Sequence, residues 1–347
     1  MALLTTSLPG HLTSLAEDGN EIQPNCSRES VDWSFTYVPA YILSISVLGI
    51  VFNIFVLMVF ILHKKPCTVA EIYLSNLAAA DLLLVSFLPF WAVSAWNKFE
   101  WIFGLAMCKM VNVSILMNVY CSIYFLVLVS IDRYLALVHP LSHGGMRCPK
   151  CAKISCGVVW ILGLILSVPK FINRKLVSHR NITSCTEDDL KTTELMILVL
   201  GFFIPISIIF FCTVNILKAL RNRSIQRVKT RKTDHKADTL VLVVLLAFLI
   251  CWVPFHLREV PTWLHQAGIL TVCTSKEIQH FCGQIFTYLA FFNSVLNPIL
   301  YVIVGRNFRD KLKELFKQWD QKRSATISRT TSTMLLRSLK SQQNIIN

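Results

Sequence analysis

Charged residues are scarce in this sequence of 347 residues. They make up 16% of the chain, whereas 54% of the residues are hydrophobic and the mean hydropathy is +0.55. A soluble domain contains about a quarter charged residues and cannot expose so much apolar surface to water. The composition therefore excludes a soluble enzyme and predicts an integral membrane protein.

Several catalytic motifs are also missing. The sequence contains no His-Glu-x-x-His, no Gly-x-Ser-x-Gly and no phosphate-binding loop, which disfavours an enzyme. No lysine lies between Lys276 and Lys311, so the last apolar run lacks the group that would bind retinal. We find no internal repeat and only one central acid, which disfavours a transporter or channel. The net charge is +14, but the basic residues lie between the apolar runs rather than on one basic face, which disfavours a nucleic-acid partner.

Apolar runs near the length of a membrane-crossing helix, about 20 residues, occur seven times. We therefore expect an all-α membrane protein with four parts. These are an extracellular N-terminus (1–36), a seven-transmembrane helix bundle (37–304), a short amphipathic eighth helix on the membrane surface (305–319) and a disordered cytoplasmic tail (320–347). The seven runs are 38–62, 69–96, 105–131, 154–169, 195–217, 239–257 and 281–304.

The basic residues indicate how the bundle is oriented. Of 34 Lys and Arg residues, 24 lie in the segments 63–68, 132–153 and 218–236 or after residue 304. The positive-inside rule places these segments in the cytoplasm and the N-terminus outside. We thus expect a multi-pass protein of the plasma membrane. Two glycosylation sequons, at Asn25 and Asn181, fall on the predicted outer side.

Four cysteines face the predicted oxidising side of the membrane, where disulfides persist. Cys108 opens the third span and Cys185 lies in the loop 170–194, which suggests a bridge that holds the loop over the bundle. Cys26 and Cys273 either form a second bridge or remain two unpaired thiols. On the cytoplasmic side, Cys148-Pro149-Lys150-Cys151 has the spacing of half a metal site but no matching second pair, so we interpret it as two loop cysteines.

An acidic group at membrane depth is costly and marks a functional site. Asp81 lies in the middle of the second run, and other runs carry polar residues at similar depth. Oxygen ligands around one carboxylate suit a sodium ion or a water network, and the alternative is a polar packing cluster without an ion. The ion ligands we expect are Asp81, Asn118, Ser122, Asn293 and Asn297. No other cofactor is expected.

Taken together, the motifs resemble the rhodopsin-like class of G-protein-coupled receptors over nearly all of 37–318. The third run ends in Asp132-Arg133-Tyr134, the sixth contains Cys251-Trp252-Val253-Pro254, and the seventh contains Asn297-Pro298-Ile299-Leu300-Tyr301. Asn53, Asp81, Trp160 and Pro205 match the landmark positions of their own spans.

The resemblance implies a role for each group of residues. Asp132 and Arg133 would latch the resting state, and Trp252 above Pro254 would bias rotation of the sixth span. Tyr301 would swing inward on activation. Thr213 stands where most relatives have a tyrosine that links to Tyr301. The remaining switch positions are Tyr134, Asn297 and Pro298, together with the packing switch of Pro205, Ile123 and Phe248.

Within that class the sequence is most similar to the bradykinin (kinin) receptors, in the stretches 69–82, 88–92, 130–138 and 301–305. Angiotensin and chemokine receptors share only parts of these stretches. Features of the two kinin receptor types are mixed: Val138-His139-Pro140 resembles type 1, and Gly268-Ile269-Leu270 resembles type 2. The similarity implies a kinin peptide ligand, a Gq-type G protein and calcium signalling.

The ligand-binding positions that this resemblance implies are only partly kept. Two aspartates that hold the peptide's N-terminal arginine are replaced by Thr262 and His280. Glu259 and Glu277 could substitute for them, or the cognate kinin differs in sequence. Glu259 could instead form a surface pair with Arg258. Five acids and one base in 1–36 suit capture of a cationic peptide. The implied ligand contacts are Trp91, Asn112, Arg174, Phe255, Glu259, Gln284 and Phe291.

The segment after Gly305 has apolar residues at helical spacing among Lys and Arg, which predicts an amphipathic helix along the inner leaflet. No cysteine follows it, so a palmitoyl anchor is not expected. Nine Ser or Thr residues lie between Ser324 and Ser341. Their phosphorylation would add the negative charge that recruits arrestin.

Overall fold

The structure is a computed structural model. It describes residues 32–63, 66–139, 148–179, 182–188, 190–225, 234–257, 264, 268–303, 305 and 308–324. Several predicted positions lie outside the described residues or have side chains that do: Asn25, Cys26, Asn181, Glu259, Cys273 and Gln284.

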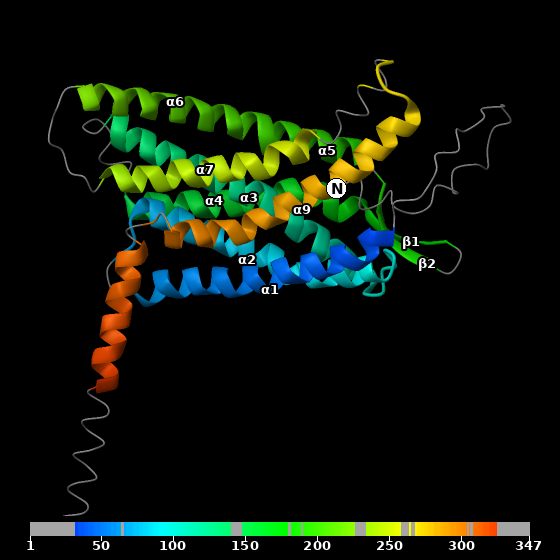
Figure 1. Cartoon of the computed structure of the whole chain (residues 1–347), viewed down its shortest axis with the longest axis horizontal. Helices are drawn as coiled ribbons and strands as arrows, with labels where there is room; N and C mark the ends of the chain where they lie inside the picture. The colour runs from blue at the N-terminus through cyan, green and yellow to red at the C-terminus, as the bar shows by residue number, and fades with distance from the viewer. Residues whose placement is uncertain are drawn as a thin grey trace, which may run out of the picture.

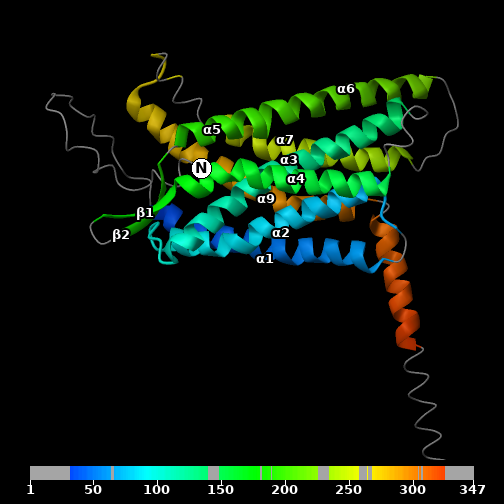
Figure 2. The ribbon, with the colours of Figure 1, turned by 180° about the vertical axis from the view of Figure 1, so that it is seen from behind.

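Each of the seven predicted apolar runs forms a helical segment, and the segments lie side by side in one bundle (Figures 1 and 2). In the described part of the chain, six helices are long and apolar enough to cross a membrane, and Leu246–Leu257 is a shorter apolar helix. The first four segments are α1 (Asp32–Leu62), α2 (Val69–Trp96), α3 (Gly104–Val138) and α4 (Pro149–Asn173). The last three are α5 (Leu190–Leu198) continued by α6 (Ile204–Ile225), α7 (Asp234–Leu257) and α9 (Val272–Ile303).

The fifth segment contains a wide turn that the sequence analysis did not predict. A π-helix, Val199–Phe203, joins α5 to α6 just before Pro205. The hydroxyl of Tyr124 on α3 donates a hydrogen bond of 2.9 Å to the Leu200 carbonyl in this turn. A π-turn leaves backbone groups without regular helical partners, so this bond satisfies one of them.

Local sequence explains where two helices start. Thr68 caps α2: its hydroxyl accepts from the Glu71 backbone N–H, and the Glu71 carboxylate accepts from the Thr68 N–H at 2.7 Å. This capping box satisfies two otherwise unpaired donors. Cys148 caps α4, with Pro149 at the first helical position, where its missing N–H costs nothing. The helix starts therefore follow from side chains that flank the apolar runs.

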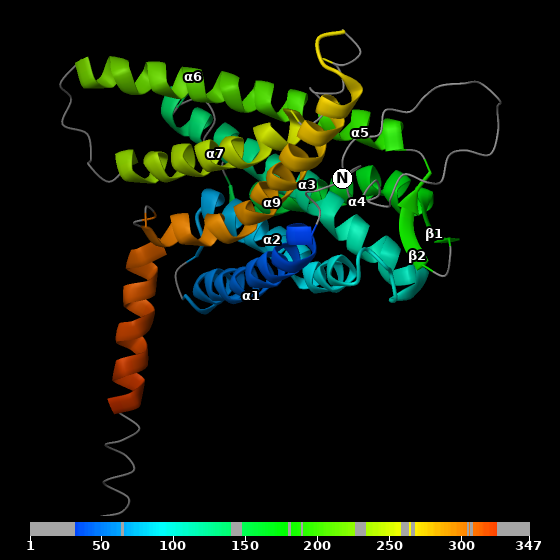
Figure 3. The ribbon, with the colours of Figure 1, turned by 45° about the vertical axis from the view of Figure 1, so that its right-hand side comes forward.

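α3 runs through the middle of the bundle, between the other helices in all three ribbon views (Figures 1, 2 and 3). It carries large fully buried side chains, among them Tyr120, Phe125 and Leu126. The outer helices instead expose apolar residues, such as Val47 on α1, Ile161 on α4 and Phe210 on α6. The apolar residues exposed on the outside of the bundle fit a lipid environment.

The helical bundle also carries a short hairpin that the sequence analysis did not predict. Two antiparallel strands, β1 (Arg174–His179) and β2 (Ile182–Glu187), lie at one end of the bundle (Figure 1). Their register pairs Leu176 with Cys185 and Arg174 with Glu187. Neither strand shows a strict alternation of apolar and polar residues, so no strand is predicted from the local pattern.

Residues 308–324 form a further helix at the opposite end, drawn in orange-red, which turns sharply away from α9 (Figures 1 and 3). It begins later and ends later than the predicted 305–319. At the other end of the bundle, α1 starts at Asp32, ahead of the predicted boundary at residue 37. Phe308 is buried against Phe55 and Phe60, with ring centroids 6.1 and 5.6 Å apart, while Phe316 and Trp319 are exposed. Leu312 and Leu315 of the same helix also pack against this core, so the helix has one apolar side on the bundle and further apolar residues exposed.

Candidate functional site

A polar cluster lies at the centre of the bundle around the fully buried carboxylate of Asp81. Asn118 and Ser294 donate to its Oδ1 at 2.9 and 2.8 Å, and Asn297 donates to its Oδ2 at 2.9 Å. Asn118 also lies 3.2 Å from the Ser122 hydroxyl. The sequence placed these side chains at similar depth, and the structure brings α2, α3 and α9 together at this carboxylate.

The cluster also contains buried polar atoms that have no hydrogen-bond partner among the described residues. Both amide atoms of Asn293 are in this state, as are Oδ1 of Asn53 and Oδ1 of Asn297. Buried polar atoms are rarely left unpaired unless water or an ion completes them. One carboxylate with hydroxyl and amide oxygens is a donor set that fits a hard monovalent cation or ordered water.

An aromatic column lies in the sixth segment, on the helix that contains Pro254. Trp252 stacks on Phe248, with centroids 5.7 Å apart, and meets Phe255 edge-on at 5.5 Å. His256 faces Phe202 of the fifth segment at 4.2 Å. A displacement of Trp252 would therefore also displace the rings of Phe248 and Phe255, which it contacts.

The expected packing switch occupies the interior next to this column. Pro205 is buried at the start of α6, and Ile123 on α3 is fully buried. Phe248 is buried below Trp252. The structure therefore gathers side chains from α3, α6 and α7 in one densely packed region, where small shifts are converted into discrete rearrangements.

At the end of α3 nearest helix 308–324, an ion pair joins neighbouring residues. Nη2 of Arg133 lies 3.5 Å from Oδ2 of Asp132, and Asp132 is buried. The Tyr134 hydroxyl lies 3.0 Å from Nε2 of His139, and its ring contacts Phe211 at 5.7 Å. The structure therefore contains the pair of Asp132 with Arg133 that the resemblance implies.

Tyr301 is buried on α9, next to the helix proline Pro298. Its hydroxyl has no hydrogen-bond partner within the part of the chain that the structure describes. Thr213 on α6 is half-buried and is too short to supply the phenol group that most relatives have there.

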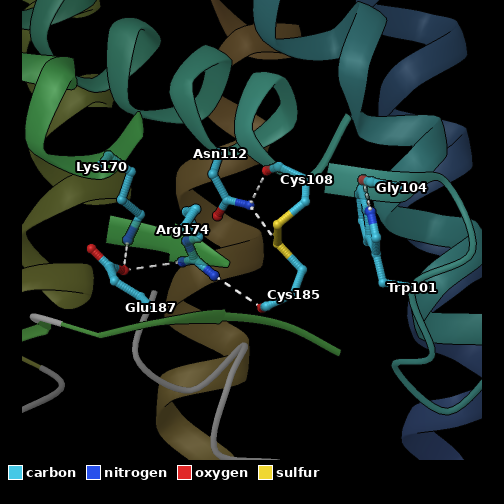
Figure 4. Close-up of a disulfide and its surroundings, with 8 residues drawn as sticks. All are labelled: Trp101, Gly104, Cys108, Asn112, Lys170, Arg174, Cys185 and Glu187. Carbon is cyan, nitrogen blue, oxygen red and sulfur yellow. Dashed lines mark hydrogen bonds and ion pairs between the residues drawn. A yellow bond between two sulfur atoms is a disulfide. The ribbon is translucent and has the colours of Figure 1, made fainter. Parts of the chain in front are cut away.

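At the opposite end, a disulfide joins Cys108 of α3 to Cys185 of β2, with Cα atoms 5.8 Å apart (Figure 4). The amide of Asn112 donates to the Cys108 carbonyl at 2.8 Å and lies 3.5 Å from the Cys185 sulfur. The backbone N–H of Trp101 donates to the Thr183 carbonyl at 2.7 Å. The hairpin is thus fixed to the bundle by a covalent bond and by hydrogen bonds.

A buried charge cluster holds the other side of the hairpin, and the sequence analysis missed it. The Glu187 carboxylate pairs with Lys170 of α4 and, at 3.1 Å, with Arg174 of β1 (Figure 4). The Thr193 hydroxyl donates to the same carboxylate at 2.8 Å. Arg174 also donates to the Cys185 carbonyl at 3.1 Å. Burial lowers the pKa of Arg174 to about 10, and Glu187 opposes this shift. Because that pKa is well above neutral pH, the guanidinium of Arg174 stays charged beside the Glu187 carboxylate.

The described residues among the expected ligand contacts are all buried in this state. Trp91 packs edge-on against Phe99 at 6.0 Å, and Phe255 and Phe291 are 5% and 4% exposed. Asn112 contacts the Cys185 sulfur of the hairpin, and Arg174 is the first residue of β1 in the same hairpin. The side chain of Gln284 and all of Glu259 lie outside the described residues.

Comparison with known proteins agrees with this architecture. A profile of the family described as 7 transmembrane receptor (rhodopsin family) matches residues 52–301. The human B2 bradykinin receptor is 44% identical over 315 residues, which cover 88% of this chain and 81% of that protein. The rabbit (Oryctolagus cuniculus) B2 bradykinin receptor is 46% identical over 78% of this chain and 76% of its own length. The human B1 bradykinin receptor is 38% identical over 87% of this chain and 89% of its own length.

These matches cover the polar cluster around Asp81, the aromatic column at Trp252 and the Asp132–Arg133 pair, all of which lie between residues 52 and 301. The seven-helix bundle predicted from the apolar runs is confirmed, and the protein is a receptor and not an enzyme. The chain belongs to the rhodopsin family of seven-transmembrane receptors, and its sequence is similar to those of the bradykinin receptors.

Proposed function

We propose that this chain is a plasma-membrane receptor for a kinin peptide that signals through a heterotrimeric G protein of the Gq type. The observation that carries the proposal is the 44% identity to the human B2 bradykinin receptor across 88% of this chain. Similarity over that length includes both the helices that face the ligand and those that face the G protein.

The peptide binds at the hairpin end of the bundle, on the extracellular side. This orientation is supported by the 24 basic residues that lie on the opposite side. Trp91, Phe255 and Phe291 supply aromatic contacts, joined by Asn112, Arg174, Glu259 and Gln284. The acids of the N-terminal segment 1–36 attract a cationic peptide before it docks.

Binding shifts an equilibrium between two arrangements of the bundle. A peptide that displaces Phe255 also displaces Trp252, because the two rings meet edge-on with centroids 5.5 Å apart. The sixth segment then rotates about Pro254, and Phe248 moves against Ile123 and Pro205. This rotation opens the far end of the bundle.

Release of Arg133 from Asp132 completes the change. The freed guanidinium then contacts the G protein, and Tyr301 moves inward. Phosphorylation of the Ser and Thr residues between Ser324 and Ser341 subsequently recruits arrestin through added negative charge.

A sodium ion at Asp81 favours the resting arrangement. The support for this is the set of oxygen atoms around the carboxylate, including Ser122, and the amide atoms of Asn293 that lack partners among the described residues. An ion that binds one arrangement better than the other stabilises it by its difference in affinity.

The test is calcium release in cells that express this chain, after verification of surface expression. The cells are challenged separately with bradykinin, with bradykinin lacking its C-terminal arginine, and with angiotensin. A response to either kinin supports the proposal, and the ratio of the two responses assigns the receptor type. Silence to both kinins, or a response to angiotensin alone, would contradict it.

A further inference from the structure

Two cysteines at the start of α4 lie in the geometry of a reactive pair. The structure joins Cys148 to Cys151, and their Cα atoms are 5.3 Å apart, within the usual range for a disulfide. Cys148 is the N-cap residue, and its sulfur accepts a hydrogen bond of 3.1 Å from the Cys151 backbone N–H. Pro149 and Lys150 separate them, which gives the spacing Cys-x-x-Cys at the N-terminus of a 25-residue helix.

The surroundings favour a thiolate at Cys148. The positive end of the helix dipole and the Cys151 N–H both stabilise an anionic sulfur at the cap position. The side chains of Lys150 and Lys153 are exposed nearby and add positive charge. Cys151 is exposed and Cys148 is half-buried, so solutes can reach the pair.

The position of the pair distinguishes it from the structural disulfide of Cys108. It lies at the bundle end that carries Arg133, which the proposed orientation places in the reducing cytosol. Disulfides there are rare and are mostly transient, catalytic or redox-sensing. A bond between an exposed and a half-buried cysteine in that compartment is therefore one that forms and breaks.

We propose that Cys148 and Cys151 form a reversible redox-modification site on the cytoplasmic face, oxidised by peroxide and reduced by glutathione. The inference goes beyond the proposed function and shares with it only the orientation of the bundle. It concerns the first turn of α4, where Cys148 is the N-cap residue and Cys151 lies inside the helix.

The chemistry balances with the two thiols and one peroxide. The Cys148 thiolate attacks a peroxide oxygen, the O–O bond breaks, and a sulfenic acid and one water form. The Cys151 thiol attacks the sulfenic sulfur and expels the second water, so the two thiols lose two electrons and the peroxide gains them. Glutathione reverses the bond through a mixed disulfide, and a second glutathione releases the free thiols as glutathione disulfide forms.

The experiment follows both thiols by mass spectrometry in full-length receptor from cells treated with hydrogen peroxide. We expect the peptide containing both cysteines to lose two hydrogen atoms, and to regain them when membranes are then incubated with glutathione. In Cys151→Ser the partner is gone, so a sulfenic-acid trap should label Cys148. Cys67 is the internal control, because burial raises the pKa of its thiol and keeps it protonated.

Three outcomes would overturn the proposal. One is no loss of hydrogen at peroxide doses that leave Cys67 unmodified. Another is a bond that glutathione does not reduce, which would make it a fixed structural bridge. The third is labelling of Cys148 in intact cells by a membrane-impermeant maleimide, which would place the pair outside. The third outcome tests orientation without peptide or G protein, so it is distinguishable from failure of the proposed ligand.

Discussion

The ammonium group of Lys311 lies 2.9 Å from the carboxylate of Glu71, although the two residues are 240 positions apart in the sequence. Lys311 belongs to the helix 308–324 and Glu71 to the capping box of α2, and both side chains are about a tenth exposed. A second contact, 3.0 Å between His63 and Glu314, joins the same helix to the end of α1. The helix is thus attached to the bundle by polar contacts and by Phe308.

We expect Glu71→Gln to loosen this attachment while it preserves the start of α2. Glutamine can still complete a capping box, so the change removes the charge and leaves the cap. Lys311 would then be nearly buried without its anion, at a cost of about 1–3 kcal/mol. The measurement is the thermal unfolding midpoint of purified receptor.

Lys313→Gln is the matched control, because Lys313 is exposed on the same helix. It should leave the midpoint unchanged. Lys311→Gln in the Glu71→Gln background should recover part of the loss, since it removes the unpaired charge. A double variant that is as unstable as the sum of the two single ones would show that the residues do not interact.

A second prediction concerns the contact between α3 and α4. A Cβ atom added at Gly163 would lie 2.7 Å from the sulfur of Cys121, which is fully buried. Gly163→Ala should destabilise the receptor, because overpacking costs about 1–3 kcal/mol and exceeds the gain of about 1 kcal/mol or less in helix propensity. Thermal unfolding measures this difference.

Gly157 on the same helix serves as the control, since a Cβ there meets nothing within 4 Å among the described residues. Gly157→Ala should therefore be neutral or slightly stabilising. Adding Cys121→Ala to Gly163→Ala should restore most of the stability by removing the clashing sulfur. If Gly157→Ala and Gly163→Ala have equal effects, the close packing at Cys121 is not what requires glycine.

The third prediction tests the buried cluster under the hairpin. Glu187→Gln leaves the cations of Lys170 and Arg174 buried without an anion, which typically costs about 3–5 kcal/mol. We expect a large loss of surface expression and a lower unfolding midpoint. Asp188→Asn is the control, because the ion pair of Asp188 with Lys175 is mostly exposed and such pairs contribute little.

Lys170→Gln combined with Glu187→Gln removes one of the two buried cations. This double variant should be more stable than Glu187→Gln alone. Equal stability of the two would mean that charge imbalance is not the cause. A Glu187→Gln variant with normal expression would show that the cluster does not hold the hairpin.

The elements that the sequence predicted are those determined by local composition. Each span follows from its own apolar run, and Asp81 is conspicuous because a carboxylate is costly in lipid. The pairing of β1 with β2 was missed because it depends on two segments that each lack a period-two pattern. The bond of Glu187 to Lys170, and that of Lys311 to Glu71, depend on distances across the fold that no local pattern encodes.

In the candidate site, too, contacts between sequence neighbours could be predicted and contacts across the fold could not. Asp132 and Arg133 are neighbours in the chain, so their pairing is visible in the sequence. The hydrogen bond from Tyr124 to the Leu200 carbonyl exists only because a π-turn presents that carbonyl to α3. A turn of this kind arises from packing against α3, where Gly201 leaves room for Tyr120, and not from the residues of the turn alone.

A fourth prediction concerns sodium at Asp81. Replacing NaCl by N-methyl-glucamine chloride at equal ionic strength should raise kinin affinity, within the range of about 5- to 150-fold that typical coupling energies give. Asp81→Asn should abolish this difference, and Ser122→Ala should reduce it. The stabilisation of purified receptor by NaCl, measured without peptide, should disappear in the same variants. A sodium effect that survives in Asp81→Asn would place the ion elsewhere.

The last prediction separates ligand binding from signalling. Arg133 lies at the far end of α3 from the disulfide of Cys108, so a change there should not reach the peptide. Arg133→Ala removes the guanidinium that contacts the G protein in the proposed mechanism, and it leaves the aromatic column at Trp252 unchanged. We expect calcium release to fall by more than about tenfold, equivalent to about 1.4 kcal/mol of coupling, while binding of labelled kinin to membranes is retained.

The control for that variant is Arg133→Lys, which keeps a positive charge but not the planar fork of the guanidinium. If charge alone is needed, the lysine variant should signal. If bidentate geometry is needed, it should be as silent as Arg133→Ala. Loss of binding as well as signalling in Arg133→Ala would indicate a folding defect, because Asp132 would then be buried without its cation, and would remove Arg133 from the proposed mechanism.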